Sequence, residues 1–127
     1  MPKSIVRSDR IPTPVASYSS AVRADKFVFV SGQIPIDPAT GELVTGSIEL
    51  ETRRVLDNLA LVLEAAHLGL AEVVKVTVFL TDMADFKAFD LAYKSYFPVD
   101  PPARSTVAVA ALPRGVHVEI EAIALAS

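Results

Sequence analysis

Apolar and polar residues alternate along several short stretches of the chain, and the period of this alternation indicates the secondary structure. FVFVSGQI, residues 27–34, is rich in β-branched and aromatic residues and contains a glycine near its end, which predicts a buried strand that ends at a turn or bulge. SSAVRA, residues 19–24, predicts a shorter strand before it. DPATGE, residues 37–42, has proline and glycine where turns favour them, so we expect the chain to turn there and continue into a helix.

A first helix is predicted from residue 47 onwards. Ser47 can cap its start, and Glu49 and Glu51 suit the positive end of a helix dipole. Gly69 is well placed to end the helix. We expect the two glutamates and the Arg53-Arg54 pair to form its solvated face. The opposite face has apolar or small residues at alternating steps of four and three, namely Ile48, Thr52, Val55, Leu59, Val62 and Ala66.

A strand and a second helix follow. VVKVTVFLT, residues 73–81, predicts a strand with one wetter face, because Val74, Val76, Val78 and Leu80 alternate with Lys75, Thr77, Phe79 and Thr81. Asp82 is predicted to cap the second helix, which should stop at Pro98. The helix carries an aromatic ring of residues at helical spacing, which we expect in the core: Phe86, Phe89, Tyr93 and Phe97.

Two final strands are predicted at residues 103–110 and 117–125. The last strand alternates Val118, Ile120 and Ala122 with Glu119, Glu121 and Ile123. The order of elements predicts one α+β domain over residues 1–127, with two helices packed on one face of a mixed sheet. The strands carry apolar residues on both sides, and the helices cannot cover both. We therefore expect this chain to associate with other copies.

Composition excludes several classes of protein. The 127 residues are 51% hydrophobic, but charged residues such as Glu64 and Lys75 interrupt the apolar runs, so we expect no membrane span. The first ten residues lack the apolar segment of a secretory signal, and we expect a cytoplasmic protein. Cysteine is absent, which excludes thiol nucleophiles, disulfides and thiolate metal sites.

Charge and histidine content argue against two further classes of site. The net charge is −3, and Arg53-Arg54 is the longest basic run, so nucleic acid is a poor candidate partner. The histidines are His67 and His117, and they lack HExxH spacing, so we expect no metal site. We expect structural positions for both: His67 near a helix C-terminus, where the dipole favours an imidazole, and His117 at the start of a strand.

The final third of the chain contains charged residues in apolar surroundings. PPARSTVAV, residues 101–109, places Arg104 at the start of a strand, where a guanidinium requires a carboxylate or phosphate partner. Glu119 and Glu121 share one face of the last strand, and a carboxylate in such surroundings can have a raised pKa and handle a proton. Arg104 and Glu119 could be neighbours in the sheet. From spacing alone, a structural salt bridge between them is favoured over a substrate site.

Three of these stretches together resemble the RidA family of reactive intermediate imine deaminases, also known as endoribonuclease L-PSP. They are SGQIPIDPATGE at residues 31–42, PPARSTVAV, and HVEIEAIAL at the end, in family order and spacing. The resemblance covers nearly the whole chain. It implies a chorismate-mutase-like fold and a homotrimer whose active sites lie in clefts between subunits.

The resemblance also implies a reaction and a set of site residues. The reaction is hydrolysis of enamines and imines, such as 2-aminoacrylate or 2-iminopropionate, to a 2-keto acid and ammonia. Arg104 would bind the substrate carboxylate and Glu119 would position or activate the attacking water. The implied substrate-binding positions are Tyr18, Ser31, Gly32, Asp90 and Thr106. The implied chemistry needs no metal or organic cofactor, since a protonated imine is already electrophilic.

The sequence departs from the family pattern near these positions. Thr106 stands where many members have cysteine, and Asp90 stands where the better known deaminases have asparagine. The segment Ala16 to Ser20 also differs from the usual Gly-Pro-Tyr-x-Gln loop around the tyrosine. No histidine stands at a spacing from Ser31 that would indicate a catalytic pair. A structural role for its hydroxyl in a turn is therefore favoured over a role as nucleophile.

Other functions stay open at this point. A non-catalytic trimer that binds small carboxylates through Arg104 fits the same residues. The older interpretation as an endoribonuclease or translation inhibitor agrees poorly with the negative net charge of the chain. A pathway-specific relative, such as a 2-aminomuconate-type deaminase, would keep the chemistry and change the substrate.

Overall fold

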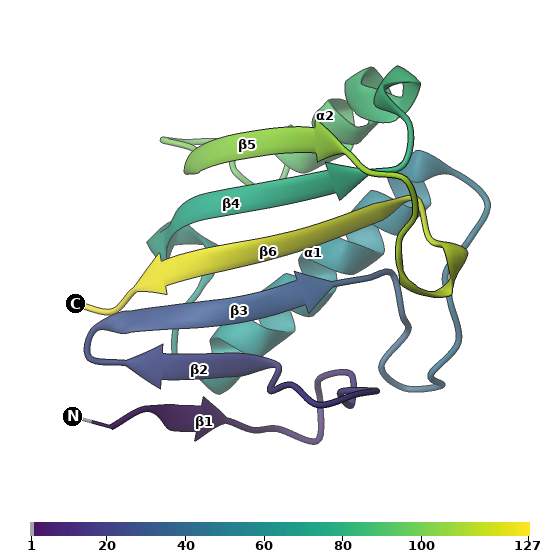
Figure 1. Ribbon diagram of the computed structural model, residues 1–127. Helices are drawn as coiled ribbons and strands as arrows, with labels where there is room; N and C mark the ends of the chain where they lie inside the picture. Colours follow the sequence, from purple (N-terminus) through teal and green to yellow (C-terminus); the bar gives the residue numbers. More distant parts are fainter. Residues whose placement is uncertain (1) are drawn as a thin grey trace.

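The computed structural model describes residues 2–127. Within this range six strands form one mixed sheet in the order β1-β2-β3-β6-β4-β5 (Figure 1). Strand β5 runs parallel to β4, and the other neighbouring strands are antiparallel. The strands are β1 (Ser4–Val6), β2 (Ala21–Ala24), β3 (Phe27–Gln33), β4 (Val73–Leu80), β5 (Ala103–Ala108) and β6 (Val118–Leu125).

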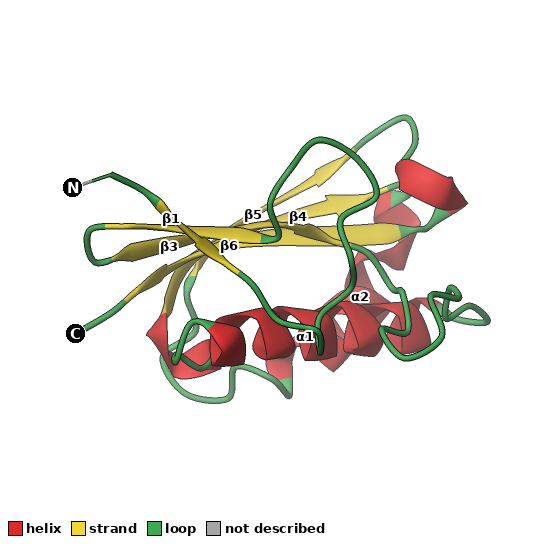
Figure 2. Ribbon diagram, turned by 90° about the horizontal axis from the view of Figure 1, so that it is seen from below, coloured by secondary structure: helices red, strands yellow, loops and turns green. Residues whose placement is uncertain are grey.

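The helices α1 (Ile48–Ala65) and α2 (Phe86–Lys94) lie together on one face of the sheet (Figure 2). Short 3-10 turns occur at Leu70–Glu72, Met83–Asp85 and Pro113–Gly115. The predicted α+β class and the placement of the helices are therefore confirmed. Strand β1 has no counterpart among the predicted strands, because three residues are too few to show a period.

The core lies between the sheet and α1. The fully buried side chains of the helix are Val55, Leu56, Leu59, Val62 and Leu63, and those of the sheet include Val28, Val76, Val78, Leu80, Val118 and Ile120. Both sets recur at the spacing that sequence periodicity predicts, 3.6 residues for the helix and two for the strands. Burial of these aliphatic side chains is the main term that holds α1 on the sheet.

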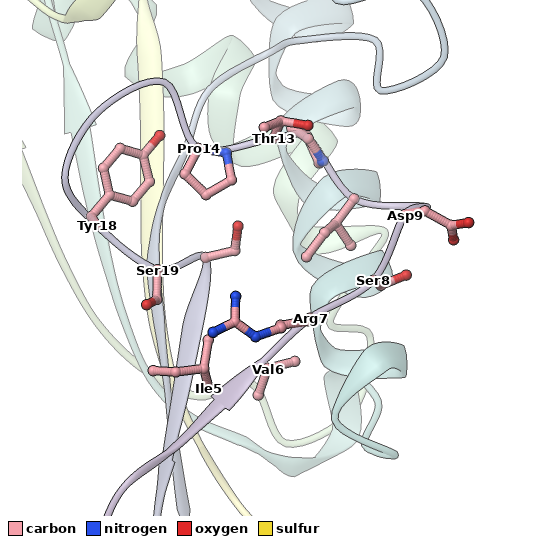
Figure 3. Close-up of a pocket in the computed structure, with 12 residues that line it drawn as sticks. Ile5, Val6, Arg7, Ser8, Asp9, Thr13, Pro14, Tyr18 and Ser19 are labelled. Carbon is pink, nitrogen blue, oxygen red and sulfur yellow. The ribbon is translucent and has the colours of Figure 1, made fainter.

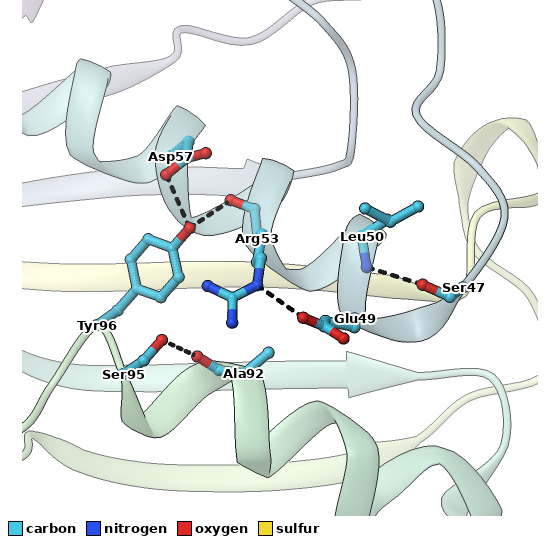
Figure 4. Close-up of polar contacts among 8 residues, drawn as sticks. All are labelled: Ser47, Glu49, Leu50, Arg53, Asp57, Ala92, Ser95 and Tyr96. Atoms are coloured by element: carbon cyan, nitrogen blue, oxygen red, sulfur yellow. Dashed lines mark hydrogen bonds and ion pairs between the residues drawn. The ribbon is translucent and has the colours of Figure 1, made fainter.

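Helix α1 begins as predicted and ends earlier than predicted. The Ser47 hydroxyl accepts a hydrogen bond from the backbone N–H of Leu50 at 3.1 Å (Figure 4). Gly69 does not end the helix. His67 takes the left-handed conformation after the last turn (φ 61°), and the N–H of Leu68 donates to the carbonyl of Leu63 at 2.8 Å.

Helix α2 also differs from its prediction at both ends. Asp82 caps the 3-10 turn before the helix, where its carboxylate accepts from Ala84 N–H at 2.9 Å. The helix ends at Lys94, so Phe97 lies beyond it. The aromatic residues still form one continuous stack, with ring centroids 6.4, 5.4 and 4.8 Å apart along Phe86, Phe89, Tyr93 and Phe97.

Polar contacts fix α2 against α1. The Tyr96 hydroxyl lies near the carbonyl of Arg53 at 3.3 Å and near the Asp57 carboxylate at 2.9 Å (Figure 4). The Arg53 guanidinium pairs with Glu49 one turn earlier, at 3.1 Å. Burial, followed by the hydrogen bond to Asp57, raises the pKa of Tyr96, so the phenol remains a donor at neutral pH.

The sheet face opposite the helices is left largely uncovered by residues 2–127. Phe27, Phe29, Leu125 and Val107 are 42%, 45%, 40% and 43% exposed. Val74, predicted to lie inward with Val76, is 43% exposed, because the pairing of β4 with β6 shifts register between Val73 and Lys75. The exposed side chains make this face far more apolar than an ordinary solvated surface.

One residue predicted on the solvated face of α1 is buried. Glu51 is 3% exposed, and its carboxylate accepts from His117 backbone N–H at 2.9 Å and contacts His117 Nδ1 at 2.6 Å. The hydrogen bond to Glu51, and then its charge, raise the pKa of His117. His117 lies just before β6, as expected, but it also ties the start of α1 to the sheet.

We predict that His117→Gln destabilises the protein most at low pH. The raised pKa means that the folded state favours the imidazolium, so the ion pair contributes fully below the unfolded pKa of about 6.5 and is lost as pH rises through the folded value. The imidazole is largely exposed, so we expect a loss of about 1 kcal/mol or less at pH 5.5 to 6. Thermal unfolding of both proteins between pH 5.5 and 9 measures it.

The control for this series is His67→Asn, at a left-handed position that asparagine tolerates. It replaces a histidine other than the partner of Glu51, so it separates loss of that ion pair from loss of an imidazole. A His117→Gln difference that stays constant across the range would contradict the assigned ion pair.

Candidate active site

Arg104 lies on β5 with its side chain on the helix side of the sheet. Its Nη1 donates to Asp90 Oδ1 of α2 at 2.8 Å. The guanidinium carbon lies 4.6, 5.5 and 5.6 Å from the ring centroids of Tyr93, Phe89 and Phe86. The side chain is 21% exposed, and a guanidinium in such a setting is stabilised by its counter-charge and by the aromatic faces.

The Arg104 guanidinium lines a cavity at the edge of the sheet. The cavity has a volume of about 420 Å³ and is lined by Asp90, Tyr93, Lys94, Phe97, Pro101, Pro102 and Arg104. That volume is in the range of small-ligand sites. Since β5 is the last strand of the sheet, its outer edge leaves backbone N–H and C=O groups that a ligand or another chain can reach.

Thr106 lies two residues after Arg104 on β5, opposite the buried Val78 in the neighbouring strand. Its hydroxyl is buried and has no hydrogen-bond partner among residues 2–127. The accessible polar groups at this position are therefore those of the backbone along the strand edge. Backbone groups near Thr106 are therefore the candidates for a contact with a ligand.

Glu119 lies on β6 on the opposite, helix-free face of the sheet, and Gly32 lies beside it on β3. A Cβ atom on Gly32 would be 1.9 Å from Oε2 of Glu119, so only glycine leaves room for the carboxylate here. The pairing of β3 with β6 shifts register between Val30 and Gln33, which places Gly32 in a bulge. Burial, and secondarily the charge of Glu121, raise the pKa of Glu119.

Ser31 precedes Gly32 on β3, and Tyr18 lies in the loop before β2. Ser31 Oγ donates to the carbonyl of Ser19 at 2.6 Å, and Ser31 N–H donates to the carbonyl of Ser20 at 2.9 Å. These bonds fix the loop that carries Tyr18 to β3. The Ser31 hydroxyl is therefore structural, although it belongs to a strand rather than to the predicted turn.

Tyr18 borders a second groove, shown in Figure 3. The groove has a volume of about 500 Å³ and lies between the N-terminal segment, residues 5–14, and residues 18–20. The Tyr18 side chain is large and the residue is 46% exposed. Its hydroxyl lies on the same side of the loop as Pro14 in this view. The Tyr18 hydroxyl accepts a hydrogen bond from Val15 N–H at 3.5 Å, and the ring lies at the surface in the loop that Ser31 anchors.

The prediction that Arg104 and Glu119 are sheet neighbours is wrong. Strand β4 lies between β5 and β6. Val76 pairs with Arg104 and Phe79 pairs with Glu119, so the charged residues also fall on opposite faces of the sheet. The salt bridge considered between them is absent from residues 2–127, and the ion pair of Arg104 is made with Asp90 instead.

The predicted site residues therefore form two separate groups in one chain. The first, the arginine group, consists of Asp90, Arg104 and Thr106 at the β5 edge. The second, the glutamate group, consists of Tyr18, Ser31, Gly32 and Glu119 on the helix-free side.

The described residues show neither a metal-binding cluster nor a membrane-spanning helix. Residues 2–127 bring no three histidine, aspartate or glutamate side chains together as metal ligands. Neither α1 nor any other helix in this range is both long and apolar enough to cross a bilayer.

Comparison with known proteins identifies the family. A family model described as Endoribonuclease L-PSP matches residues 8–126. The chain belongs to the RidA family. A RutC family protein of Pyrococcus horikoshii is 48% identical over 122 residues, covering 96% of this chain and 97% of that protein. The 2-iminobutanoate/2-iminopropanoate deaminase of Mus musculus is 43% identical over 123 residues, covering 97% and 91%.

A solved structure gives the same fold for this RidA-family chain. The crystal structure of E. coli TdcF with bound serine superposes with a TM-score of 0.93 at 38% identity, covering 98% of this chain and 99% of that one. The resemblance carried by SGQIPIDPATGE, PPARSTVAV and HVEIEAIAL is thereby confirmed at the level of family and fold.

Two residues of this RidA-family chain matter at the site and were not predicted there. Tyr93 lies directly beneath Arg104, and its helical spacing from Asp90, three residues earlier, could have indicated a shared face. Burial raises the pKa of Tyr93, and Arg104 opposes that shift. Asn58 is fully buried and donates to the carbonyls of Ile34 at 3.2 Å and Ile36 at 2.7 Å, which fixes the segment after Gly32. Hydrophobic periodicity carries no signal for such an amide.

We predict that Gly32→Ala displaces the Glu119 carboxylate in this RidA-family protein. The added methyl group would occupy the position of Oε2, so the carboxylate must move away, which it can do because it is the end of a flexible side chain. As the carboxylate gains solvent, its pKa should fall towards the ordinary glutamate value. Side-chain carboxyl NMR titration of Glu119 in both proteins measures the shift.

Gly69→Ala is the matched control, because the nearest atom to its added Cβ is Glu72 Oε1 at 3.5 Å. This variant should leave the pKa of Glu119 where it is. A folded Gly32→Ala protein with an unchanged Glu119 pKa would show that the carboxylate does not lie over the glycine.

Proposed function

We propose that this RidA-family protein hydrolyses small 2-imino acids and their enamine tautomers, of the 2-aminoacrylate and 2-iminopropionate type, to 2-keto acids and ammonia. The observation that carries the proposal is Arg104, a guanidinium that borders a small cavity and holds donors suited to a carboxylate. The name of the mouse relative, which matches 97% of this chain at 43% identity, supports the same reaction.

The active site is proposed to form between two copies of the chain. Arg104 and Glu119 cannot approach one substrate within a single chain, because they lie on opposite faces of the sheet with β4 between them. The free edge of β5 and the exposed apolar face supply surfaces for a neighbouring subunit. In the homotrimer typical of the family, the arginine group of one subunit meets the glutamate group of the next.

The proposed reaction uses the carboxylate and the iminium of the substrate separately. Arg104 holds the carboxylate, and the β5 backbone near Thr106 fixes its orientation. A water oxygen attacks the iminium carbon, the C=N π electrons move to nitrogen, and Glu119 takes a proton from the water. Glu119 then delivers this proton to nitrogen. The C–N bond breaks and ammonia leaves, while the hydroxyl group gives its proton to Glu119 and the C=O bond of the 2-keto acid forms.

The surroundings of Glu119 suit this role. The raised pKa makes the Glu119 carboxylate a better proton acceptor than an exposed glutamate. Gly32 allows the carboxylate to lie close to the backbone of β3. Tyr18 and Ser31 are proposed to border the same substrate, Tyr18 through its ring and hydroxyl and Ser31 by holding the loop. The carbon of the protonated imine is already electrophilic, so the proposed step requires no cofactor.

A second candidate function is carboxylate binding without turnover. The solved relative TdcF holds serine, which supports a site for small carboxylate ligands in this family. Under this alternative Arg104 would bind a 2-keto acid or amino acid and Glu119 would have no proton to transfer. Saturable binding that depends on Arg104 without imine hydrolysis would favour it.

We predict that Arg104→Ala lowers kcat/KM for imine hydrolysis by about 100-fold or more, since two charge-assisted hydrogen bonds to the substrate carboxylate are lost. The assay generates 2-aminoacrylate with a lyase and follows pyruvate formation with and without the protein. Arg53→Ala is the control, because it removes an exposed arginine that pairs with Glu49 on α1.

The control should retain the activity of the parent protein. Turnover by Arg104→Ala at the rate of the parent protein would contradict the proposed role of the arginine. A correctly assembled parent protein that does not accelerate pyruvate formation would contradict the reaction itself.

A further inference from the structure

Asp90 already binds one hydrogen-bond donor of Arg104, the arginine that is proposed to anchor the substrate. Its Oδ1 accepts from Arg104 Nη1 at 2.8 Å, while the guanidinium has five N–H donors in all. Both side chains line the same cavity, and the Asp90 side chain is 43% exposed. The cavity therefore presents a positive and a negative group side by side to a ligand.

We propose that Asp90 is a specificity-determining residue that recognises the protonated nitrogen of the ligand, so that the site selects zwitterions over simple 2-keto acids. This inference rests on the proposed function and names the form of substrate that the site binds. An amino acid or a protonated imino acid carries its carboxylate and its N–H donors on adjacent carbons. Arg104 can take the carboxylate while the second oxygen of Asp90 accepts from the nitrogen.

The 2-keto acid lacks the matching group. It has a carbonyl oxygen where the zwitterion has N–H donors, and an oxygen acceptor next to the Asp90 carboxylate is repelled rather than bound. Lys94, the other charged side chain that lines the cavity, is a cation and attracts the carboxylates of both ligands. Among the side chains that line this cavity in one chain, Asp90 is therefore the one that discriminates between the two ligands. The Glu119 carboxylate of a neighbouring subunit would add to the same preference, and it is unchanged in an Asp90 variant. The same preference favours release of the keto-acid product.

The aromatic residues around Arg104 make this arrangement stiff. The guanidinium lies 4.6 Å from the Tyr93 ring centroid and 5.5 Å from that of Phe89, so it is held from below while Asp90 holds its side. A ligand carboxylate must bind the donors that Asp90 leaves free. A ligand that approaches these donors also approaches the negative charge of Asp90. Only a ligand with an N–H donor for Asp90 offsets that charge.

Alanine and pyruvate test the inference directly, because they differ in the ammonium and keto groups alone. Calorimetry gives both dissociation constants for the parent protein and for Asp90→Asn in their assembled form. We expect the parent protein to bind alanine more tightly than pyruvate. We expect the ratio of Kd for pyruvate to Kd for alanine to fall by about tenfold or more in Asp90→Asn, since a charge-assisted bond becomes a neutral one.

Asp25→Asn is the matched control, since it makes the same chemical change at a left-handed position in the β2–β3 hairpin. It should leave the ratio unchanged. Thermal unfolding and the assembly state of each variant show that Asp90→Asn is folded, and Asp90→Glu, which keeps the charge, should keep the preference for alanine in part.

Three results would overturn the inference. The first is a Kd ratio unchanged by Asp90→Asn. An equal tightening of both ligands would be one form of this result and would make Asp90 only a competitor for Arg104. The second is a change of the ratio in the opposite direction, and the third is a parent protein that does not bind alanine. The imine-hydrolysis assay separates these failures from failure of the proposed reaction. Turnover with an unchanged ratio contradicts the role of Asp90 alone, and a changed ratio without turnover contradicts the reaction alone.

Discussion

The ion pair between Arg104 and Asp90 determines how the functional edge of this protein is built. A guanidinium that is 21% exposed needs a counter-charge, and α2 supplies one together with the faces of Tyr93 and Phe89. Helix α2 is therefore both a layer of the fold and the wall of the candidate site. The cavity at the end of the sheet exists because the arginine, the helix and the segment at Pro101 and Pro102 meet there.

The geometry of β-strands places Arg104 and Glu119, the two residues proposed for the chemistry, on opposite faces of the sheet. Side chains alternate between faces, so the register that points Arg104 towards α2 points Glu119 away from it. The helix-free face then combines a carboxylate of raised pKa with apolar side chains such as Phe29 and Val107, which is an unfavourable surface for a lone chain. The proposed association of copies would account for both features, because it would cover the apolar face and bring the two groups together.

Sequence periodicity predicted the helices, most strands and the class of fold, because the core consists of aliphatic residues at regular spacing, as in Val76 and Val78. It did not predict the short β1, the exposure of Val74 or the buried position of Glu51, which depend on register shifts and on single polar contacts. The roles assigned to the candidate residues rest on family resemblance and stay predictions. Their separation could not be predicted, since it depends on β4 lying between β5 and β6, and strand order is not encoded in local patterns.

The most direct test of the account is complementation between two inactive variants. Arg104→Ala and Glu119→Gln should each lack imine hydrolysis. When they are coexpressed and assemble together, some sites receive an intact Arg104 from one subunit and an intact Glu119 from its neighbour. Random assembly in equal amounts should restore about one quarter of the parent activity. A mixed assembly as inactive as either variant alone would contradict a site shared between subunits.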